Sequence, residues 1–271
     1  MTKNNELDQF FTKDETIQTC LSVMKKNNID LNSFDRIIEP SAGSGNWLKY
    51  LPKFEAYDIC PLSSNIIKID YLKTEFNNHN QNILVIGNPP FGKNSSLAVK
   101  FFNHSAQYAN LITFIVPRTF RKASIINRLD KNFHMIDEKI IDNYSYYEPN
   151  DPEKSISVST TFQIWQKSDV TRQHHNDKIL NLNWCQSYEN PQFAIRRIGV
   201  YAGKIYEFNN QSPSSHFFIK SIPLDDHLWN KFYDYSFTNI MSRKFDVAGN
   251  PSITKFEFEN QLNEFLNNYN L

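Results

Sequence analysis

The sequence has 271 residues, and 29 Lys and Arg are balanced by 29 Asp and Glu, so the formal net charge at pH 7 is zero. A neutral protein has no whole-molecule attraction for phosphate, which counts against strong nonspecific binding of nucleic acid. Hydrophobic residues make up 40% of the chain and aromatic residues 14%, which is enough for a packed core. The length fits a domain of about 170 residues with a smaller partner.

Two stretches bear on where the protein works. The longest apolar run, Leu111–Val116, is far shorter than the roughly 20 residues of a membrane span. Met1–Asp8 is polar rather than signal-like. We therefore expect no membrane segment and a cytoplasmic location, or an intracellular host compartment if the protein is viral.

The sequence predicts neither a metal site nor disulfides. Cys20, Cys60 and Cys185 are scattered and form no CxxC pair and no even-numbered framework. His174 and His175 are adjacent, but no further His, Cys or clustered carboxylate lies at ligand spacing. We expect reduced thiols and no metal.

Short β-branched runs alternate with segments of helical period, which is typical of a mostly parallel sheet with crossover helices. The expected strands are residues 36–39, 54–59, 66–70, 83–86, 111–116, 133–141 and 158–166. The expected helices are residues 12–26, 46–51, 95–108 and 119–129. A hairpin-like loop, 142–155, separates the last two strands and indicates an antiparallel closing pair. The pattern predicts an α/β fold with a Rossmann-like seven-stranded sheet.

A polar stretch without periodicity, residues 167–178, indicates a linker. The sequence beyond it predicts strands at 193–198 and 216–219 and helices at 225–235 and 256–269. We expect two domains, residues 1–170 and 171–271, of which the second is a small α+β region.

Four of the seven glycines lie in two loops that follow expected strands: Gly43, Gly45, Gly87 and Gly92. Glycine permits positive φ and a close approach of main chain to a ligand. In open α/β sheets, ligands bind at the carboxyl ends of the strands. Both loops are therefore candidate ligand sites.

The first loop connects a strand to a helix, which is the context of a Gly-rich ligand loop. Its candidate binding residues are Glu39, Pro40, Ser41, Ala42, Gly43 and Gly45. The loop has neither the glycine spacing of dinucleotide sites nor the Gly-Lys-Ser/Thr of phosphate loops, which disfavours NAD and ATP. The acid at Glu39 instead fits a ligand that bears an ammonium group.

Two further acids end neighbouring strands. Asp58 ends the second strand, where a carboxylate can accept hydrogen bonds from ribose hydroxyls, and Asp70 ends the third. Any one of the three acids could equally cap a loop. Together they predict a ligand with an amine, a ribose and an adenine at one rim of the sheet.

The second loop, Asn88-Pro89-Pro90-Phe91, directly follows an apolar strand, and its two prolines fix φ and remove two donors. A stiff array of acceptors results. The Asn88 side-chain oxygen and the Pro89 carbonyl can accept both hydrogens of an amino group such as N6 of adenine, while Phe91 stacks on the base. Asn88, Pro89, Pro90 and Phe91 are the candidate catalytic residues, and Asn88 is also a candidate cofactor contact.

These motifs resemble the class I, S-adenosylmethionine-dependent methyltransferases that act on the amino group of adenine. The resemblance covers roughly residues 8–167. Glu39–Gly45 is similar to the family's cofactor loop, Asp58 to its ribose acid, Asp70 to its adenine-edge acid and Asn88–Phe91 to its catalytic motif.

An N-terminal element supports the same resemblance. Asp8-Gln9-Phe10-Phe11-Thr12 looks like the family's Phe-Tyr-Thr-Pro element, except that Lys13 replaces proline. The resemblance therefore implies that Phe11 and Thr12 also contact S-adenosylmethionine.

The order of these elements resembles restriction-modification and phage-type enzymes. It implies methylation of adenine N6 in DNA after base flipping, a C-terminal target-recognition region and an associated restriction nuclease. Two basic groups are candidate nucleic-acid contacts, with a solvated surface as the alternative for each. They are a stripe on the expected helix 119–129, namely Arg118, Arg121 and Lys122 with Arg128 and Lys131, and a C-terminal group, Arg196, Arg197 and Lys204, interleaved with Phe193, Tyr201 and Tyr206.

Three alternatives stay open at this point. RNA adenine is the nearest, because flexible single strands present bases without flipping. A related class methylates the glutamine amide of proteins through an Asn-Pro-Pro-aromatic loop, in which Tyr is usual where this chain has Phe91. The third is a binding module with a degenerate cofactor pocket.

Overall fold

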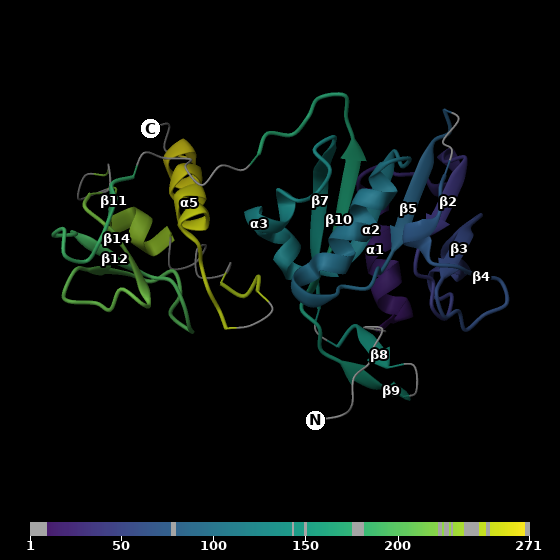
Figure 1. Cartoon of the computed structure of the whole chain (residues 1–271), viewed down its shortest axis with the longest axis horizontal. Helices are drawn as coiled ribbons and strands as arrows, with labels where there is room; N and C mark the ends of the chain where they lie inside the picture. The colour runs from purple at the N-terminus through teal and green to yellow at the C-terminus, as the bar shows by residue number, and fades with distance from the viewer. Residues whose placement is uncertain are drawn as a thin grey trace. The chain divides into compact units, whose positions relative to one another are not determined.

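The computed structural model describes residues 10–76, 80–142, 144–148, 151–174, 182–221, 224, 228, 230–235, 244–247 and 250–268. The chain divides into two compact units, Met1–His174 and His175–Leu271 (Figure 1).

The first unit is built on a seven-stranded sheet. Its strands are β2 (Arg36–Glu39), β3 (Glu55–Asp58), β4 (Ile67–Lys68), β5 (Ile83–Gly87), β6 (Leu111–Pro117), β7 (Phe133–Ile141) and β10 (Thr160–Lys167). They lie in the order β4-β3-β2-β5-β6-β10-β7. The first five pair in parallel, and β10 lies antiparallel to both β6 and β7. The prediction of a Rossmann-like seven-stranded α/β sheet with an antiparallel closing pair is confirmed.

Helices cover both faces of this sheet. Successive residues of a buried strand point to opposite faces, so each face has an apolar core of its own. Ile83 and Val85 of β5 belong to the core cluster that includes α2 (Ser96–Ala106). Leu84 and Ile86 of the same strand belong to the cluster that includes α1 (Asp14–Lys26). This three-layer packing leaves the carboxyl ends of the parallel strands at one rim.

Short 3-10 helices fill several connections: η1 (Leu31–Ser33), η2 (Trp47–Tyr50), η3 (Tyr71–Lys73), η4 (Lys93–Ser95) and η5 (Arg118–Arg121). The expectation of one helix over 119–129 is wrong. Lys122, with φ −84° and ψ 136°, is extended and separates η5 from the four-residue α3 (Ala123–Ile126).

The loop expected at 142–155 contains two strands, β8 (Tyr146–Glu148) and β9 (Asp151–Ile156). They form a three-stranded antiparallel sheet with β1 (Phe11–Thr12), in which Phe11 pairs with Tyr147 and Thr12 with Tyr146. The partner strand lies near the start of the chain, so local periodicity did not reveal this sheet.

The second unit contains a four-stranded antiparallel sheet in the order β11-β14-β12-β13. Its strands are β11 (Trp184–Cys185), β12 (Phe193–Arg196), β13 (Ile205–Glu207) and β14 (His216–Ile219). Helix α5 (Lys255–Asn268) packs Phe258, Leu262 and Phe265 into one cluster with Ile195 and Ile219. Residues 228 and 230–235 are helical, and the rest of the helix expected at 225–235 lies outside the described residues. The predicted small α+β region is confirmed.

Across the described part of both units, no helix is long and apolar enough to cross a membrane.

Candidate functional site

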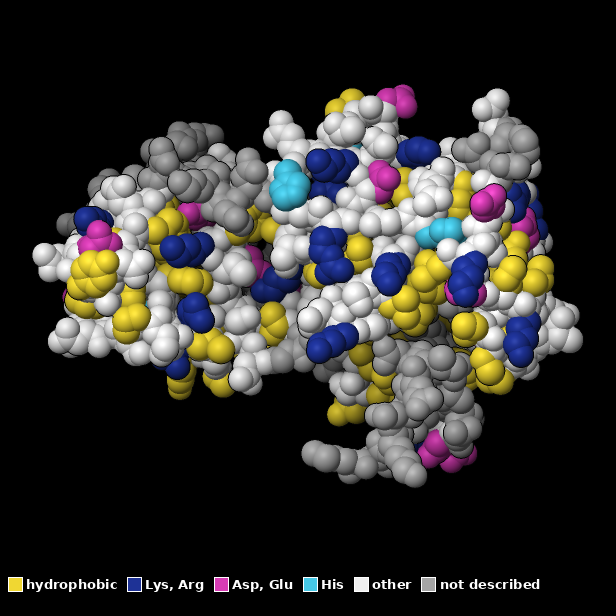
Figure 2. Space-filling model, in the orientation of Figure 1, with side chains coloured by type: hydrophobic (Ala, Val, Ile, Leu, Met, Phe, Trp, Pro, Cys, Tyr) yellow, Lys and Arg dark blue, Asp and Glu magenta, His cyan; other side chains and the backbone are white. Residues whose placement is uncertain are grey.

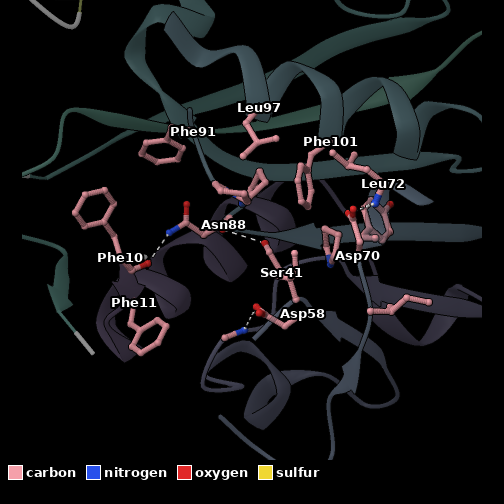
Figure 3. Close-up of a pocket in the computed structure, with 17 residues that line it drawn as sticks. Phe10, Phe11, Ser41, Asp58, Asp70, Leu72, Asn88, Phe91, Leu97 and Phe101 are labelled. Atoms are coloured by element: carbon pink, nitrogen blue, oxygen red, sulfur yellow. Dashed lines mark hydrogen bonds between the residues drawn. The ribbon is translucent and has the colours of Figure 1, made fainter. Parts of the chain in front are cut away.

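A cavity of about 330 Å³ lies at the carboxyl ends of β2 to β5 (Figure 3). Most of the predicted site residues line it: Phe11, Pro40, Ser41, Gly43, Asp58, Asp70, Asn88, Pro89, Pro90 and Phe91. Thr12, Glu39 and Ala42 line a smaller cavity of about 30 Å³ that shares Phe11, Ser41 and Asn88 with the first. Gly45 is not among the residues that line either cavity, and its N–H donates to the Ala42 carbonyl at 2.7 Å. The two loops and the N-terminal element therefore meet at one place.

The cavity also has an apolar lining, to which Phe10 of the N-terminal element contributes. The sequence did not single out its other members: Ile59, Ile69, Tyr71, Leu72, Leu97 and Phe101. Leu97 and Phe101 lie four residues apart on α2 and so share a face. Ile59 directly follows Asp58, and Tyr71 directly follows Asp70. Adjacency to the strand-end acids was the signal that could have found these two residues.

The side-chain amide of Asn88 is oriented by the N-terminal element. Its Nδ2 donates to the Phe10 carbonyl at 3.2 Å (Figure 3). The same atom donates to Thr12 Oγ1, also at 3.2 Å. A flipped amide would place its oxygen against the Phe10 carbonyl, so the observed orientation is the favoured one. The opposite atom, Oδ1, is buried, and no described residue donates to it.

The backbone around Asn88 is also fixed. Gly87 has φ 150°, and a Cβ there would lie 3.2 Å from Glu39 Cγ. The Asn88 carbonyl accepts a hydrogen bond from Ser41 Oγ at 3.2 Å. The Phe91 carbonyl accepts from Leu97 N and Ala98 N at 3.1 and 3.2 Å, which joins the loop to the start of α2. The loop is therefore held at both ends.

The N-terminal element is in turn fixed by the β8–β9 hairpin. Asn46 Nδ2 donates to the Thr12 carbonyl at 2.9 Å and to the Tyr147 hydroxyl at 2.7 Å. The Phe11 ring meets the Tyr147 ring edge-on, with centroids 5.6 Å apart. Lys13 N donates to the Ser145 carbonyl at 3.1 Å. The orientation of Asn88 thus depends on residues far from it in the sequence.

Asp58 and Asp70 both line the cavity and also cap loops. Asp58 Oδ2 accepts from Gly43 N at 2.8 Å, and its Oδ1 accepts from Cys60 N at 2.7 Å. Asp70 Oδ1 accepts from Leu72 N at 3.2 Å, and its Oδ2 lies 3.3 Å from Lys73 Nζ. Each carboxylate oxygen carries two acceptor sites, so these contacts leave acceptor capacity toward a ligand.

Glu39 is a buried carboxyl group beside this site, and only 2% of its surface is exposed. Burial raises the pKa of Glu39 well above its usual range, and the negative charge of Asp58 raises it further. Oε2 of Glu39 has no hydrogen-bond partner among the described residues, and neither has Trp47 Nε1, whose residue lines the same small cavity. A buried carboxyl group without a hydrogen-bond partner is costly to ionise, and an opposite charge beside it would lower that cost.

The predicted basic stripe does not form a single exposed face. Arg121 Nε lies 3.0 Å from Glu138 Oε1, and Lys122 is only 7% exposed. Arg118 is half-buried at the start of η5, whereas Arg128 and Lys131 are exposed. A stripe read from sequence spacing included residues that the fold places in its interior.

The basic residues of the second unit differ in their contacts: Arg196 is hydrogen-bonded to its neighbours, whereas Arg197 and Lys204 lie beside aromatic rings. Arg196 is tied down, because its Nε donates to the Ile198 carbonyl at 2.9 Å and its Nη1 to Ser215 Oγ at 3.1 Å. Arg197 is exposed, with its guanidinium 5.6 Å from the Phe217 ring. Lys204 Nζ lies 5.1 Å from the Tyr206 ring.

Two expectations about the site, the N-terminal cofactor element and the adjacent histidines, fall partly on residues that are not described. Asp8 and Gln9 of the N-terminal element lie outside the described residues, and so does His175. Within the described ranges there is no group of three or more His, Cys, Asp or Glu that could hold a metal ion.

A seven-stranded sheet of this order, with a ligand cavity at the carboxyl ends of its parallel strands, is the fold of the class I methyltransferases. The family model of the EDM2 methyltransferase-like domain matches residues 32–178, and the chain belongs to this family. No curated protein matches the sequence.

Three solved structures similar to this chain have different substrates in their names. A candidate RNA methyltransferase of Pyrococcus horikoshii is 12% identical, with a TM-score of 0.45 over 62% of this chain and 90% of that one. Magnesium protoporphyrin IX methyltransferase of Synechocystis, with bound S-adenosylmethionine, is 9% identical, with a TM-score of 0.40 over 57% and 79%. The type IIL restriction-modification enzyme MmeI, in complex with DNA, is 12% identical, with a TM-score of 0.37 over 70% and 42%. Likeness at this level gives no indication of the substrate of this chain.

Gly43→Ala is expected to destabilise the first unit. Gly43 has φ 55°, and a Cβ there would lie 2.7 Å from Phe11 Cε1. The strained backbone and the displaced ring should together lower the free energy of unfolding by about 1–3 kcal/mol, measured by urea denaturation. The neighbouring Ser44→Ala, as a control, should change it by less than about 0.5 kcal/mol. Equal stability of Gly43→Ala and the wild type would show that Phe11 is not packed on this loop.

Proposed function

We propose that the chain transfers a methyl group from S-adenosylmethionine to the N6 amino group of an adenine in DNA, flipped into the cavity beside Asn88 and Phe91. The observation that carries this proposal is the buried Oδ1 of Asn88, which has no described donor while its Nδ2 is held by Phe10 and Thr12. An unfilled acceptor at this point fits an amino group better than a carbonyl or a hydrocarbon.

The residues present fit the cofactor. Glu39 is the acceptor for its ammonium group, Asp58 for the ribose hydroxyls and Asp70 for the edge of its adenine, while Phe11 and the loop Pro40–Gly45 supply the wall. When bound, S-adenosylmethionine supplies the methyl group on a positively charged sulfur. The volume of the cavity, about 330 Å³, lies within the range of small-molecule sites.

The protein's contribution to the reaction is positioning and electrostatics. Adenine N6 is a poor nucleophile because its lone pair is delocalised into the ring. Asn88 Oδ1 and the Pro89 carbonyl accept hydrogen bonds from its two N–H groups and return electron density to nitrogen, while Phe91 stacks on the base. The methylated nitrogen, then positively charged, releases one proton to water. Because Asn88 and the loop are already fixed, little reorganisation accompanies the reaction.

The choice of DNA rests on the resemblance in the order of elements to restriction-modification enzymes, and the same resemblance suggests a nuclease partner. RNA adenine uses the same acceptors and is the alternative substrate. Phe91 in place of the usual Tyr, together with the basic groups, disfavours protein glutamine. Of the six basic residues that the sequence suggested as nucleic-acid contacts, Arg118, Arg121, Lys122, Arg196, Arg197 and Lys204, the exposed Arg197 is the best supported, whereas Lys122 is buried, Arg121 is paired with Glu138 and Arg196 is bonded to its neighbours.

Asn88→Ala is expected to lower kcat for methyl transfer at least about a hundredfold, because it removes an acceptor that acts on the reacting nitrogen. Binding of S-adenosylmethionine should stay within a few-fold of wild type, as measured by calorimetry. Turnover is measured with labelled cofactor and an adenine-containing oligonucleotide. Wild-type kcat in this variant would exclude Asn88 from catalysis.

Glu39→Gln is expected to raise the stability of the protein and to weaken its binding of the cofactor. Because the folded-state pKa of Glu39 is raised, the folded protein binds more protons than the unfolded chain between the two pKa values, so stability falls as pH rises through that window. Glutamine has no carboxyl group to ionise, so the variant does not lose stability in this window. It should therefore unfold at a higher temperature than wild type above neutral pH. It also lacks the negative charge for the ammonium group, so affinity for S-adenosylmethionine should fall about tenfold or more.

Proton release on cofactor binding gives a second measurement of the role of Glu39. Wild-type binding should ionise Glu39 and release a proton, seen by calorimetry in buffers of different ionisation enthalpy. Glu39→Gln should not release it. Equal affinity and equal proton release in both proteins would contradict the role of Glu39.

A further inference from the structure

An exposed group of apolar side chains surrounds the turn between β12 and β13 in the second unit. Ile198, Val200, Tyr201 and Phe245 are 37%, 68%, 62% and 50% exposed. Arg197 and the half-buried Lys204 lie among them, together with Lys244, of which only 6% is exposed, and these seven residues are called the turn patch. Figure 2 shows yellow hydrophobic and dark blue basic side chains interleaved over this unit. Large exposed hydrophobic side chains that gather in one place mark an interaction site.

The turn patch is continuous although it comes from two segments of the chain. Lys244 Nζ donates to the Val200 carbonyl, and Ser252 N donates to the Lys244 carbonyl at 3.0 Å. Gly199 N donates to the Pro251 carbonyl at 2.7 Å. The segment that carries Phe245 is therefore bonded directly to the turn that carries Tyr201.

The turn patch is also preorganised. Arg196, on the adjoining strand, donates from Nε to the Ile198 carbonyl at 2.9 Å, and Ala202 N donates to the Gly199 carbonyl at 2.8 Å. The turn therefore presents Val200 and Tyr201 from a hydrogen-bonded backbone, which reduces the entropy lost on binding.

The charge of the turn patch is positive. Among the described residues of 196–206 and 244–253, the acidic side chain is Asp246, which is only 1% exposed. Lys204 Nζ lies 5.9 Å from the Tyr201 ring and 5.1 Å from the Tyr206 ring. Cations beside exposed aromatic rings are complementary to a strand whose phosphates are negative and whose bases have flat apolar faces.

We propose that the turn patch binds single-stranded nucleic acid, with Tyr201 and Phe245 stacking on unpaired bases and Arg197 and Lys204 contacting phosphates. A duplex would offer phosphates to the cations but no free base face to the two rings, so exposed rings favour an unpaired segment. This inference rests on the proposed function in that nucleic acid is the substrate, and it adds a place where an unpaired strand is held.

The test is fluorescence anisotropy of the full chain with labelled oligonucleotides of mixed sequence, as single-stranded DNA, single-stranded RNA and duplex DNA. The variants are Tyr201→Ala, Phe245→Ala and the double variant, with Tyr201→Phe as the conservative change. Tyr188, which is 82% exposed in the same unit, gives the matched control Tyr188→Ala. Lys204→Gln is compared with Lys220→Gln, a change at an exposed lysine of the same unit that lies outside the turn patch.

Each aromatic-to-alanine change should weaken single-strand binding about tenfold, while Tyr201→Phe and Tyr188→Ala bind like wild type. Lys204→Gln should lower the slope of log K against log salt by about 0.7, and Lys220→Gln should leave it unchanged. Tighter binding of DNA or of RNA identifies which strand the turn patch takes. Preference for duplex, equal affinity of the Tyr201→Ala and Tyr188→Ala proteins, or no oligonucleotide binding by wild type would each overturn the proposal.

Calorimetry with S-adenosylmethionine on the same proteins separates this proposal from the catalytic one. If cofactor binding is normal and the turn-patch variants bind oligonucleotides like wild type, only the proposal of strand binding at the turn patch is overturned. If the protein does not bind the cofactor but these variants strongly weaken oligonucleotide binding, the proposed methyltransferase activity is overturned and the proposed strand-binding surface is supported.

Discussion

The hydrogen bonds that hold the Asn88 amide are the constraint on which the site depends. An asparagine amide has a donor end and an acceptor end, and it is selective only if one end is fixed. The Phe10 carbonyl and Thr12 Oγ1 fix the donor end, which leaves the acceptor end buried and unfilled. The prolines that follow Asn88 limit the backbone, so the acceptor cannot turn away at low cost. An unfilled acceptor that is held in place selects a ligand with a hydrogen to donate.

A second constraint is electrostatic. Glu39 is almost completely buried, and the charge of the nearby Asp58 raises the pKa of Glu39 further. An empty site of this kind is unfavourable for the folded protein, since an ionised carboxylate there lacks both water and a partner. A cationic ligand reverses this penalty. In the role proposed for Glu39, binding and stability are coupled through one carboxyl group, which is typical of sites that give up stability for function.

The parts of the fold that were predictable are those that local patterns encode. The apolar run of β5 and the two glycine-bearing loops predicted strands that end at a common rim, and the structure places these loops around one cavity. The β8–β9 hairpin was missed because its partner, Phe11–Thr12, lies at the other end of the first unit's sequence. The pairing of Arg121 with Glu138 of β7 was missed because it depends on how the chain folds back after α3, and it removes Arg121 from the exposed stripe that spacing alone indicated. The unfilled Oδ1 of Asn88 depends on which atoms lie nearby, and no sequence pattern states that.

The most direct test of the account is to incubate the protein with labelled S-adenosylmethionine and separate pools of duplex DNA, single-stranded DNA and RNA. The methylated nucleoside is then identified by mass spectrometry. We predict label on N6-methyladenosine or its deoxy form, with most of it in DNA and none in the Asn88→Ala protein. Label on another atom or on protein, or no label in any pool, would contradict the assignment of Asn88 as the acceptor for an adenine amino group.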